Sequence, residues 1–291
     1  MKILEIKNLV PCQCLLGEGP VWIAGQRMLY WVDILQNTIF SYSPSTHKLN
    51  SWKTTEYIGF VLVMNNNQVI GGLKSGLHYL TLNNDGTAIE KRIDYIDKEN
   101  KTIRFNDGIM DGAGGIICCT MDMLGKGQLG KYYYYHDNFK KRNVIDKGYT
   151  IANGPAIGIK NGLLYTVESV GSQMTKKGIY VSEFNKNSAT ITNKKLLIEW
   201  QKQSSPDGIV IDKNGGLWVG EFGGNILRCF DPNGSLKHEI PLPGWNITKA
   251  AFNYRGNKTS IYVTSAIFGA SKKTLKMYPN TGDVLEIICQ L

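Results

Sequence analysis

The stretch Leu217-Trp218-Val219-Gly220 and the residues that follow it decide the fold. A second hydrophobic run, Ile226-Leu227-Arg228-Cys229-Phe230, comes soon after and ends at Asp231-Pro232-Asn233-Gly234. β-branched and aromatic residues favour strands, whereas Asn, Asp, Gly and Pro favour the turns between strands. This order of strand, turn and strand predicts one unit of antiparallel sheet.

Runs of the same kind occur six times along the chain. They start at residues 29, 69, 116, 163, 217 and 261, with a mean spacing of about 46 residues. A four-stranded blade of a β-propeller takes roughly 40–50 residues, whereas a pair of β-sandwiches requires no repeat of this length. We therefore predict an all-β fold, a six-bladed β-propeller with four-stranded blades.

Two further hydrophobic runs, at residues 3–10 and 284–288, lie outside the six repeats. Neither has a blade of its own, and a propeller protects its sheet edges by closing its ring. We expect these N- and C-terminal strands to share one blade and so close the ring. No Pro- or Ser-rich linker divides the chain, so residues 1–291 are expected to form a single β-propeller domain.

The composition limits the classes of partner. The chain has 33 Lys and Arg against 24 Asp and Glu, a formal net charge of +9. Its lysine pairs, such as Lys140-Lys141 and Lys272-Lys273, fall in different repeats, which favours a solvated surface over a nucleic-acid-binding stripe. The run Tyr132-Tyr133-Tyr134-Tyr135 is expected to pack on alternate faces of a strand rather than to stack on bases. No apolar run reaches the ~18 residues of a membrane-spanning helix. We expect no nucleic-acid or membrane partner, and a monomer or weak homodimer.

The N-terminal residues and the cysteines indicate a compartment. Glu5 and Lys7 interrupt the apolar stretch that a signal peptide would need. The six cysteines include no Cys-x-x-Cys pair and no spacing typical of zinc ligands, so we expect buried, reduced thiols. Reduced thiols are usual inside cells, and we expect a cytoplasmic protein.

Polar residues occupy one position of the repeat, ten to twelve residues before the run, in five of the six repeats, and the sixth has Gly59. This position should enter the innermost strand of each blade, so the symmetry of a propeller would bring all six residues to one end of the central channel. The six residues are Glu18, Gly59, Asn106, Asn153, Asp207 and Lys249. Four of them carry side-chain oxygens, the ligands that Ca²⁺, Mg²⁺ and Mn²⁺ prefer. Asn-Gly and Asp-Gly pairs also make ordinary turns, but four such residues in one register favour a shared site.

Around these positions the sequence resembles the gluconolactonase/regucalcin/luciferin-regenerating-enzyme family of six-bladed propellers. The resemblance covers roughly residues 14–286, and its stretches include Leu16-Gly17-Glu18-Gly19-Pro20-Val21-Trp22, Arg104-Phe105-Asn106-Asp107-Gly108, Ala152-Asn153-Gly154, Ser205-Pro206-Asp207-Gly208 and Ile261-Tyr262-Val263-Thr264-Ser265-Ala266. The resemblance implies that Glu18, Asn153 and Asp207 are metal ligands. It also implies that Arg104 and Asn106 contact the substrate.

Members of this family commonly hydrolyse sugar lactones with one divalent cation, so the resemblance implies a lactonase that acts on a small sugar lactone. Ca²⁺ is the ion expected in a crystal, and Mg²⁺, Mn²⁺, Zn²⁺ or Fe²⁺ are alternatives. Some members carry acidic residues just after the position of Thr120-Met121, where this chain has Asp122, Met123 and Leu124. The sugar specificity of those members therefore does not carry over to this chain.

A mechanism can be written with these residues. The cation would polarise the lactone carbonyl, and Asp207 as general base would take a proton from the attacking water and return it to the ring oxygen. Arg104 would bind the sugar hydroxyls or the developing carboxylate. Asn106 would orient the carbonyl or share the metal. Asp107 is expected to serve a turn or to support its neighbours.

Two other functions also fit the sequence. A similar metal centre could hydrolyse phosphotriesters or other esters, and a propeller with a bound ion could be a non-catalytic calcium-binding or scaffold protein. A nucleophile activated by histidine is not expected, because the four histidines lie outside the channel positions. They are His47, His78, His136 and His238.

Overall fold

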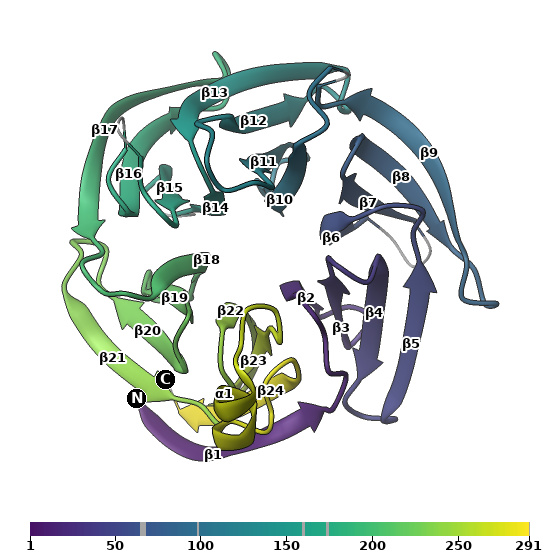
Figure 1. Cartoon of the computed structure of the whole chain (residues 1–291), viewed down its shortest axis with the longest axis vertical. Coiled ribbons are helices and arrows are strands. Elements are labelled where there is room, and N and C mark those ends of the chain that lie inside the picture. The colour runs from purple at the N-terminus through teal and green to yellow at the C-terminus, as the bar shows by residue number, and fades with distance from the viewer. Residues whose placement is uncertain (65–67, 98, 159–160, 173–174, 291) are drawn as a thin grey trace.

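The computed structural model describes residues 1–64, 68–97, 99–158, 161–172 and 175–290. Within these ranges the chain forms six four-stranded sheets, which are arranged around a ring like the blades of a propeller (Figure 1). All neighbouring strands within a blade run antiparallel, as in the pairing of β2 with β3. The predicted all-β, six-bladed propeller with four-stranded blades is confirmed.

Each of the first five blades is a meander of four consecutive strands that runs from the channel outward. Blade 1 is β2 Gly17–Ile23, β3 Met28–Asp33, β4 Thr38–Ser43 and β5 Lys48–Lys53. Blade 2 is β6 Ile58–Val63, β7 Gln68–Leu73, β8 Gly76–Leu82 and β9 Ala88–Tyr95. Blade 3 is β10 Ile103–Met110, β11 Ile116–Asp122, β12 Gly130–His136 and β13 Lys141–Tyr149. Blade 4 is β14 Ala152–Ile157, β15 Leu163–Glu168, β16 Gly178–Asn185 and β17 Thr190–Glu199. Blade 5 is β18 Ser205–Ile211, β19 Leu217–Phe222, β20 Ile226–Phe230 and β21 Leu236–Pro241.

The sixth blade joins the two ends of the chain. It contains β22 Ile247–Arg255, β23 Lys258–Ser265 and β24 Val284–Gln290, and β1 Lys2–Val10 lies outermost beside β24. Lys7 pairs with Glu286 in this register, and its Nζ lies 3.1 Å from the Glu286 carboxylate. The predicted ring closure by N- and C-terminal strands in one blade is confirmed. A short helix, α1 Lys272–Met277, lies in the connection between β23 and β24.

The six hydrophobic runs of the repeat form the second strand of each blade, as β3, β7, β11, β15, β19 and β23. These strands are sandwiched between neighbouring blades, so both of their faces are covered. In β19, for example, Leu217, Trp218 and Val219 are all buried. Burial on both faces explains why these runs are continuously apolar rather than alternating.

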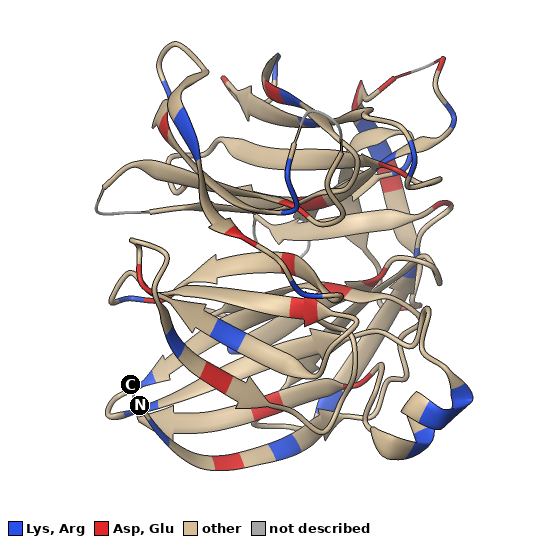
Figure 2. Ribbon diagram, turned by 60° about the vertical axis from the view of Figure 1, so that its left-hand side comes forward, with Lys and Arg blue, Asp and Glu red and all other residues tan. Residues whose placement is uncertain are grey.

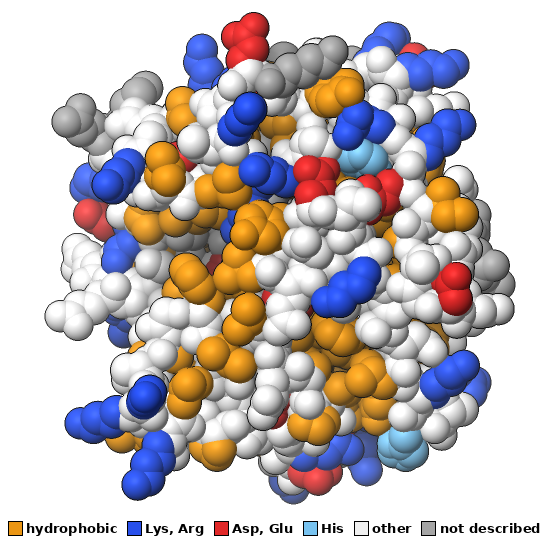
Figure 3. All heavy atoms as spheres, turned by 45° about the vertical axis from the view of Figure 1, so that its right-hand side comes forward, with side chains coloured by type: hydrophobic (Ala, Val, Ile, Leu, Met, Phe, Trp, Pro, Cys, Tyr) orange, Lys and Arg blue, Asp and Glu red, His pale blue; other side chains and the backbone are white. Residues whose placement is uncertain are grey.

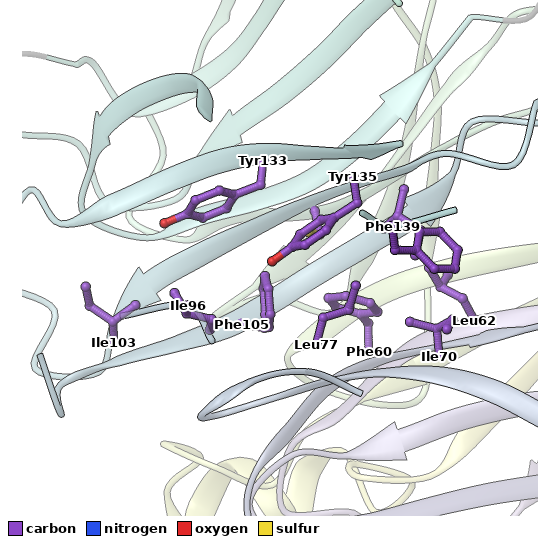
Figure 4. Packing of buried hydrophobic residues seen from close by; sticks show 12 residues of the cluster. Phe60, Leu62, Ile70, Leu77, Ile96, Ile103, Phe105, Tyr133, Tyr135 and Phe139 are labelled. Carbon is purple, nitrogen blue, oxygen red and sulfur yellow. The ribbon is translucent and has the colours of Figure 1, made fainter. Parts of the chain in front are cut away.

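The hydrophobic core lies between neighbouring blades. Phe60 of blade 2 packs edge-on against Phe105 of blade 3, with ring centroids 5.5 Å apart. Tyr133 and Tyr135 belong to the same cluster (Figure 4), whereas the other two tyrosines of the run 132–135 belong to a cluster on the opposite face of β12. The predicted alternation of the tyrosine run between two faces of a strand is confirmed.

Charged side chains are dispersed over the surface. Acidic and basic residues are interspersed along many strands and loops (Figure 2). On the face shown in Figure 3, Lys and Arg side chains stand singly or in small groups, and hydrophobic side chains gather around a hollow. No helix within the described ranges is both long enough and apolar enough to cross a membrane.

Candidate active site at one end of the central channel

Five polar residues from four innermost strands come together at one end of the channel. Glu18 lies on β2, Arg104 and Asn106 on β10, Asn153 on β14 and Asp207 on β18. Each has only 5–6% of its surface exposed. The Asn153 amide donates a hydrogen bond to the Asp207 carboxylate of the next blade, and the charges of Glu18 and Asp207 both act on Arg104. The structure thus brings together four site residues expected from the repeat and Arg104, which was expected from the family resemblance.

An irregularity in the innermost strands explains how these side chains are aimed. The pairing of β2 with β3 shifts register between Glu18 and Val21, and β6, β10, β14, β18 and β22 each carry a shift near the same level. A bulge of this kind bends the strand and re-aims its side chains. Gly19 and Gly154, which follow two of the polar residues, have φ angles of 56° and 47°. Glycine adopts this backbone conformation at little steric cost.

Backbone hydrogen bonds hold Glu18 and Asn153, two of the three expected metal ligands, in place. The Gly19 N–H donates to Oε2 of Glu18 at 2.7 Å, and the Gly154 N–H donates to Oδ1 of Asn153 at 2.9 Å. Behind Asn153, the Tyr132 hydroxyl donates to its backbone carbonyl at 2.6 Å. The backbone of their own strands therefore fixes these two side chains, and a buried tyrosine fixes the backbone of Asn153.

Arg104 and Asn106 form one hydrogen-bonded unit. Nη1 of Arg104 donates to Oδ1 of Asn106 at 2.7 Å and to the Phe105 carbonyl at 2.9 Å. Nδ2 of Asn106 donates to the Ala152 carbonyl at 3.0 Å. Among the described residues, Nη1 is the only nitrogen of this guanidinium with a hydrogen-bond partner. One edge of the guanidinium is thus held by Asn106, and its remaining N–H groups can bind a ligand.

Asp107 lies within β10 and not in a turn, and it forms one end of an ion pair that crosses the channel. Nζ of Lys249 lies 2.6 Å from Oδ2 and 2.8 Å from Oδ1 of Asp107. Asp107 belongs to blade 3 and Lys249 to blade 6, which face each other across the ring (Figure 1). Both side chains are buried. Lys249 stands at the recurring polar position but has no side-chain oxygen to offer a metal ion. In the sequence, its partnership with Asp107 is indicated only by their opposite charges.

The second blade contributes a glycine to this level for a steric reason. A Cβ atom on Gly59 would lie 2.4 Å from the carbonyl oxygen of Phe105. β6 therefore approaches β10 too closely for any side chain at this position. The missing polar group in blade 2 follows from how tightly the two strands pack.

Asp122, at the departure from the family pattern, organises its own loop. Its carboxylate accepts hydrogen bonds from the N–H groups of Leu124, Lys126 and Gly127, at 3.1, 3.1 and 2.7 Å. Leu124 is 65% exposed. This loop presents an apolar side chain to solvent, and its acidic residue is used for folding the loop.

Burial governs the electrostatics of the site. Burial and the charge of Asp107 raise the pKa of Glu18 to about 7, although Lys249 opposes the shift. Burial and the carboxylates of Glu18 and Asp107 raise the pKa of Asp207 well above its usual range. Burial also lowers the pKa of Arg104 to about 10. Three carboxylates here face two cationic side chains, which leaves one excess negative charge when all five are ionised.

The chemistry of Glu18, Asn153 and Asp207 fits a hard divalent cation. Carboxylate and amide oxygens are the ligands that such ions prefer. An amide oxygen has two lone pairs, so Oδ1 of Asn153 keeps one after accepting from Gly154. A cation at this position would also compensate the excess negative charge. Within the described ranges no group of three or more His, Cys, Asp and Glu is placed to hold a metal ion, so this set depends on its amide ligand.

The model of one protein family, described as the SMP-30/Gluconolactonase/LRE-like region, matches residues 16–267. This match spans most of the ring and includes all five polar residues of the site. The chain belongs to this family. The family resemblance of the sequence is thereby confirmed.

Several known proteins are similar to this chain over nearly its whole length. Regucalcin of Xenopus laevis is 26% identical over 303 residues, which cover 99% of this chain and 95% of that protein. The pentonolactonase XacC of Haloferax volcanii is 24% identical over 267 residues, or 90% of this chain and 86% of its own. The solved structure of regucalcin from Agrobacterium tumefaciens, described as a calcium-binding protein, has a TM-score of 0.87 at 18% identity, with 98% and 93% of the two chains covered. This structural likeness shows that the fold is shared.

Proposed function

We propose that this protein is a lactonase that hydrolyses a sugar lactone to the corresponding sugar acid with the help of one divalent cation. The observation that carries the proposal is the convergence of Glu18, Asn153 and Asp207 beside Arg104 at one buried end of the channel. Membership of a family whose description includes gluconolactonase supports the same reaction, as does the likeness to a pentonolactonase.

Glu18, Asn153 and Asp207 would hold the cation, and Ca²⁺ is the ion we propose first because a related propeller is described as calcium-binding. Mg²⁺, Mn²⁺, Zn²⁺ and Fe²⁺ are the alternatives. When bound, such an ion supplies positive charge that polarises the lactone carbonyl. The backbone N–H groups of Gly19 and Gly154 keep the side chains of Glu18 and Asn153 oriented toward their neighbours.

Asp207 is the proposed general base. In the ion-free protein, burial and the charges of Glu18 and Asp107 raise the pKa of Asp207, whereas a bound cation would lower it. Asp207 is proposed as the base because it is the carboxylate that lies beside both Asn153 and Arg104. Asp207 takes a proton from the attacking water as the water oxygen bonds to the carbonyl carbon. The bond between that carbon and the ring oxygen then breaks, and Asp207 returns the proton to the ring oxygen. The product is a hydroxy acid, with no other reactant consumed.

Arg104 is the proposed substrate-binding residue. Its N–H groups that lack a partner among the described residues would donate to sugar hydroxyls and to the carboxylate that forms. Asn106 would act chiefly through Arg104, because Oδ1 of Asn106 accepts from Nη1 and its Nδ2 is bonded to Ala152. We also propose a cytoplasmic location, which is supported by the six free thiols, all but Cys12 of them buried.

The test is acid release from unbuffered solutions of aldonolactones, measured with each of the five cations and with a chelator. The proposal expects acid release that requires a cation and stops in the chelator. A phosphotriester and a simple aryl ester are included in the same panel. Faster turnover of either than of every lactone would favour the other hydrolase function. Tight Ca²⁺ binding without turnover of any substrate would favour a non-catalytic role.

A further inference from the structure

The central channel has a second compartment beyond the polar site. A cavity of about 780 Å³ lies where the innermost strands end. Each blade contributes a hydrophobic side chain to its wall: Val21, Val63, Ile109, Ile157, Ile211 and Phe252. Lys249 also lines this cavity. Glu18 and Asp207 are not among the described residues that line it. The channel is thus polar at one end, whereas the wall of the cavity is mainly apolar, with Asp111, Asp212 and Lys213 also among its lining residues.

The ion pair of Lys249 and Asp107 stands at the boundary between these two parts. It joins opposite blades, so it crosses the channel rather than following its wall. The stem of Lys249 is held against Gly208, where an added Cβ would lie 2.6–2.7 Å from Cβ, Cγ and Cδ of the lysine. Asp107 is held from its own strand, because the Gly108 N–H donates to its Oδ1 at 2.7 Å. Both ends of the bridge are therefore fixed.

We propose that the Lys249–Asp107 ion pair is the floor of the substrate site and that it determines specificity by keeping ring substituents out of the apolar cavity. The inference rests on the lactonase function proposed above and goes beyond it by naming what limits the substrate. A lactone ring at Arg104 and Asp207 would meet a buried, charged barrier directly beneath it. Polar substituents, such as sugar hydroxyls, fit at the polar end, whereas an alkyl chain would have to pass the ion pair to reach apolar walls.

The energetic consequence is large enough to measure. Each methylene that moves from water into an apolar site improves binding by about fourfold. An unbranched heptyl chain that reached the cavity would therefore improve binding by about tenfold or more, even if only part of it were buried. With the ion pair in place, we expect a heptyl chain to leave the binding affinity of the wild-type protein unchanged.

Two double variants test this floor. Asp107→Asn with Lys249→Ala removes both charges and opens the passage. Asp107→Asn with Lys249→Met removes the same charges but keeps an unbranched side chain across the channel, so it is the matched control. Neither variant leaves a lone buried charge. Circular dichroism and thermal unfolding establish that each is folded, and Lys249→Ser replaces Lys249→Ala should the alanine variant fail to fold.

The measured quantity is the ratio of kcat/KM for δ-dodecalactone, which carries a heptyl chain, to kcat/KM for δ-valerolactone. Calorimetric binding of the corresponding δ-lactams, with and without the heptyl chain, provides a readout that needs no turnover. We expect the ratio and the affinity gain to rise about tenfold or more in the alanine variant. Neither should change in the methionine variant.

The outcomes separate the two proposals. The proposed floor would be wrong if the heptyl chain already raised the kcat/KM ratio or the lactam affinity of the wild-type protein tenfold. It would also be wrong if the folded alanine and methionine variants showed the same ratio and the same affinity gain. A wild-type protein that neither hydrolyses δ-valerolactone or any aldonolactone nor binds the unsubstituted lactam would instead overturn the lactonase function itself.

Discussion

Nζ of Lys249 lies 2.6 Å from Oδ2 of Asp107, and this contact joins blade 6 to blade 3 through the centre of the ring. Both groups are removed from water. A buried ion pair gains little net free energy of folding, because desolvation offsets much of the attraction between its charges. We therefore explain its position across the channel by its proposed role as a barrier between the polar site and the apolar cavity. A contribution to the stability of the fold explains it less well.

Breaking this pair from one side should be costly. Lys249→Met leaves the Asp107 carboxylate buried without its partner, and we expect the free energy of unfolding to fall by about 3–5 kcal/mol. Adding Asp107→Asn should restore most of the loss, since no isolated charge then remains. Urea unfolding of the wild type, both single variants and the double variant gives the coupling energy. A Lys249→Met protein as stable as the wild type would show that the pair is not formed.

The pKa of Glu18 predicts how the metal-free protein responds to pH. Because this pKa rises from 4.5 in the unfolded chain to about 7 in the folded protein, the folded state holds a proton that the unfolded state has released. The free energy of unfolding should therefore fall as pH rises from about 4.5 to about 7, by on the order of 3 kcal/mol from this group. Asp207 contributes in the same direction. Thermal unfolding in a chelator measures the trend, and Glu18→Gln, whose side chain cannot titrate, should make it shallower and leave the part that Asp207 contributes.

Calcium should oppose this loss of stability. A cation requires ionised carboxylates, so its affinity should increase as pH rises through about 7. We expect Ca²⁺ to raise Tm more at about pH 8 than at about pH 5. An equal increase at both pH values, or the same increase in Glu18→Gln, would mean that the ion binds elsewhere.

Tyr132→Phe tests the support behind Asn153. The Tyr132 hydroxyl donates to the Asn153 carbonyl and accepts from the Val167 N–H at 2.9 Å. Its removal leaves these buried groups without that partner, which should cost about 1–3 kcal/mol of stability and weaken Ca²⁺ binding. Tyr254→Phe is the matched control, because its hydroxyl accepts an exposed hydrogen bond from Lys213. Equal losses in the two variants would contradict a special role for Tyr132.

Gly59→Ala tests the close approach of blades 2 and 3. The new Cβ would fall 2.4 Å from the Phe105 carbonyl oxygen, so β10 must shift, and Arg104 and Asn106 lie on β10. We expect a loss of about 1–3 kcal/mol in stability together with lower kcat/KM. Gly25→Ala has no atom of the described residues within 4 Å of its added Cβ and should change neither quantity. Full stability and activity in Gly59→Ala would show that the two strands are not packed this tightly.

Much of the fold could be predicted from the sequence because its signal is repeated. The runs that begin at Leu29, Val69 and Leu217 mark second strands, whose burial between blades requires continuous apolar residues. The hydrophobic run at residues 284–288 had no partner nearby in the sequence, and neither had the run at residues 3–10. Pairing these two runs in one blade closes the ring, as the structure shows. A register of polar residues relative to those runs was then enough to locate Glu18 and Asp207 on innermost strands.

The contacts within the site could not be predicted in the same way. Asp107 follows Asn106 in a stretch typical of a turn, and the bulge between Phe105 and Asp107 that keeps it in the strand has no clear sequence signal. Lys249 reaches Asp107 only because two opposite strands stand one lysine side chain apart across the channel. Distances across a ring depend on how all six blades pack, which no local pattern encodes.

The most direct test of the proposed mechanism is lactone hydrolysis by Asp207→Asn, because Asp207 is both a proposed ligand and the proposed base. Acid release from the best aldonolactone is measured in saturating Ca²⁺ for the wild type, for Asp207→Asn and for Asp85→Asn, a control at an exposed turn whose carboxylate accepts hydrogen bonds from Thr87. We predict that Asp207→Asn lowers kcat by about 100-fold or more while remaining folded, and that Asp85→Asn retains wild-type activity. Near wild-type turnover by folded Asp207→Asn would contradict the proposed mechanism.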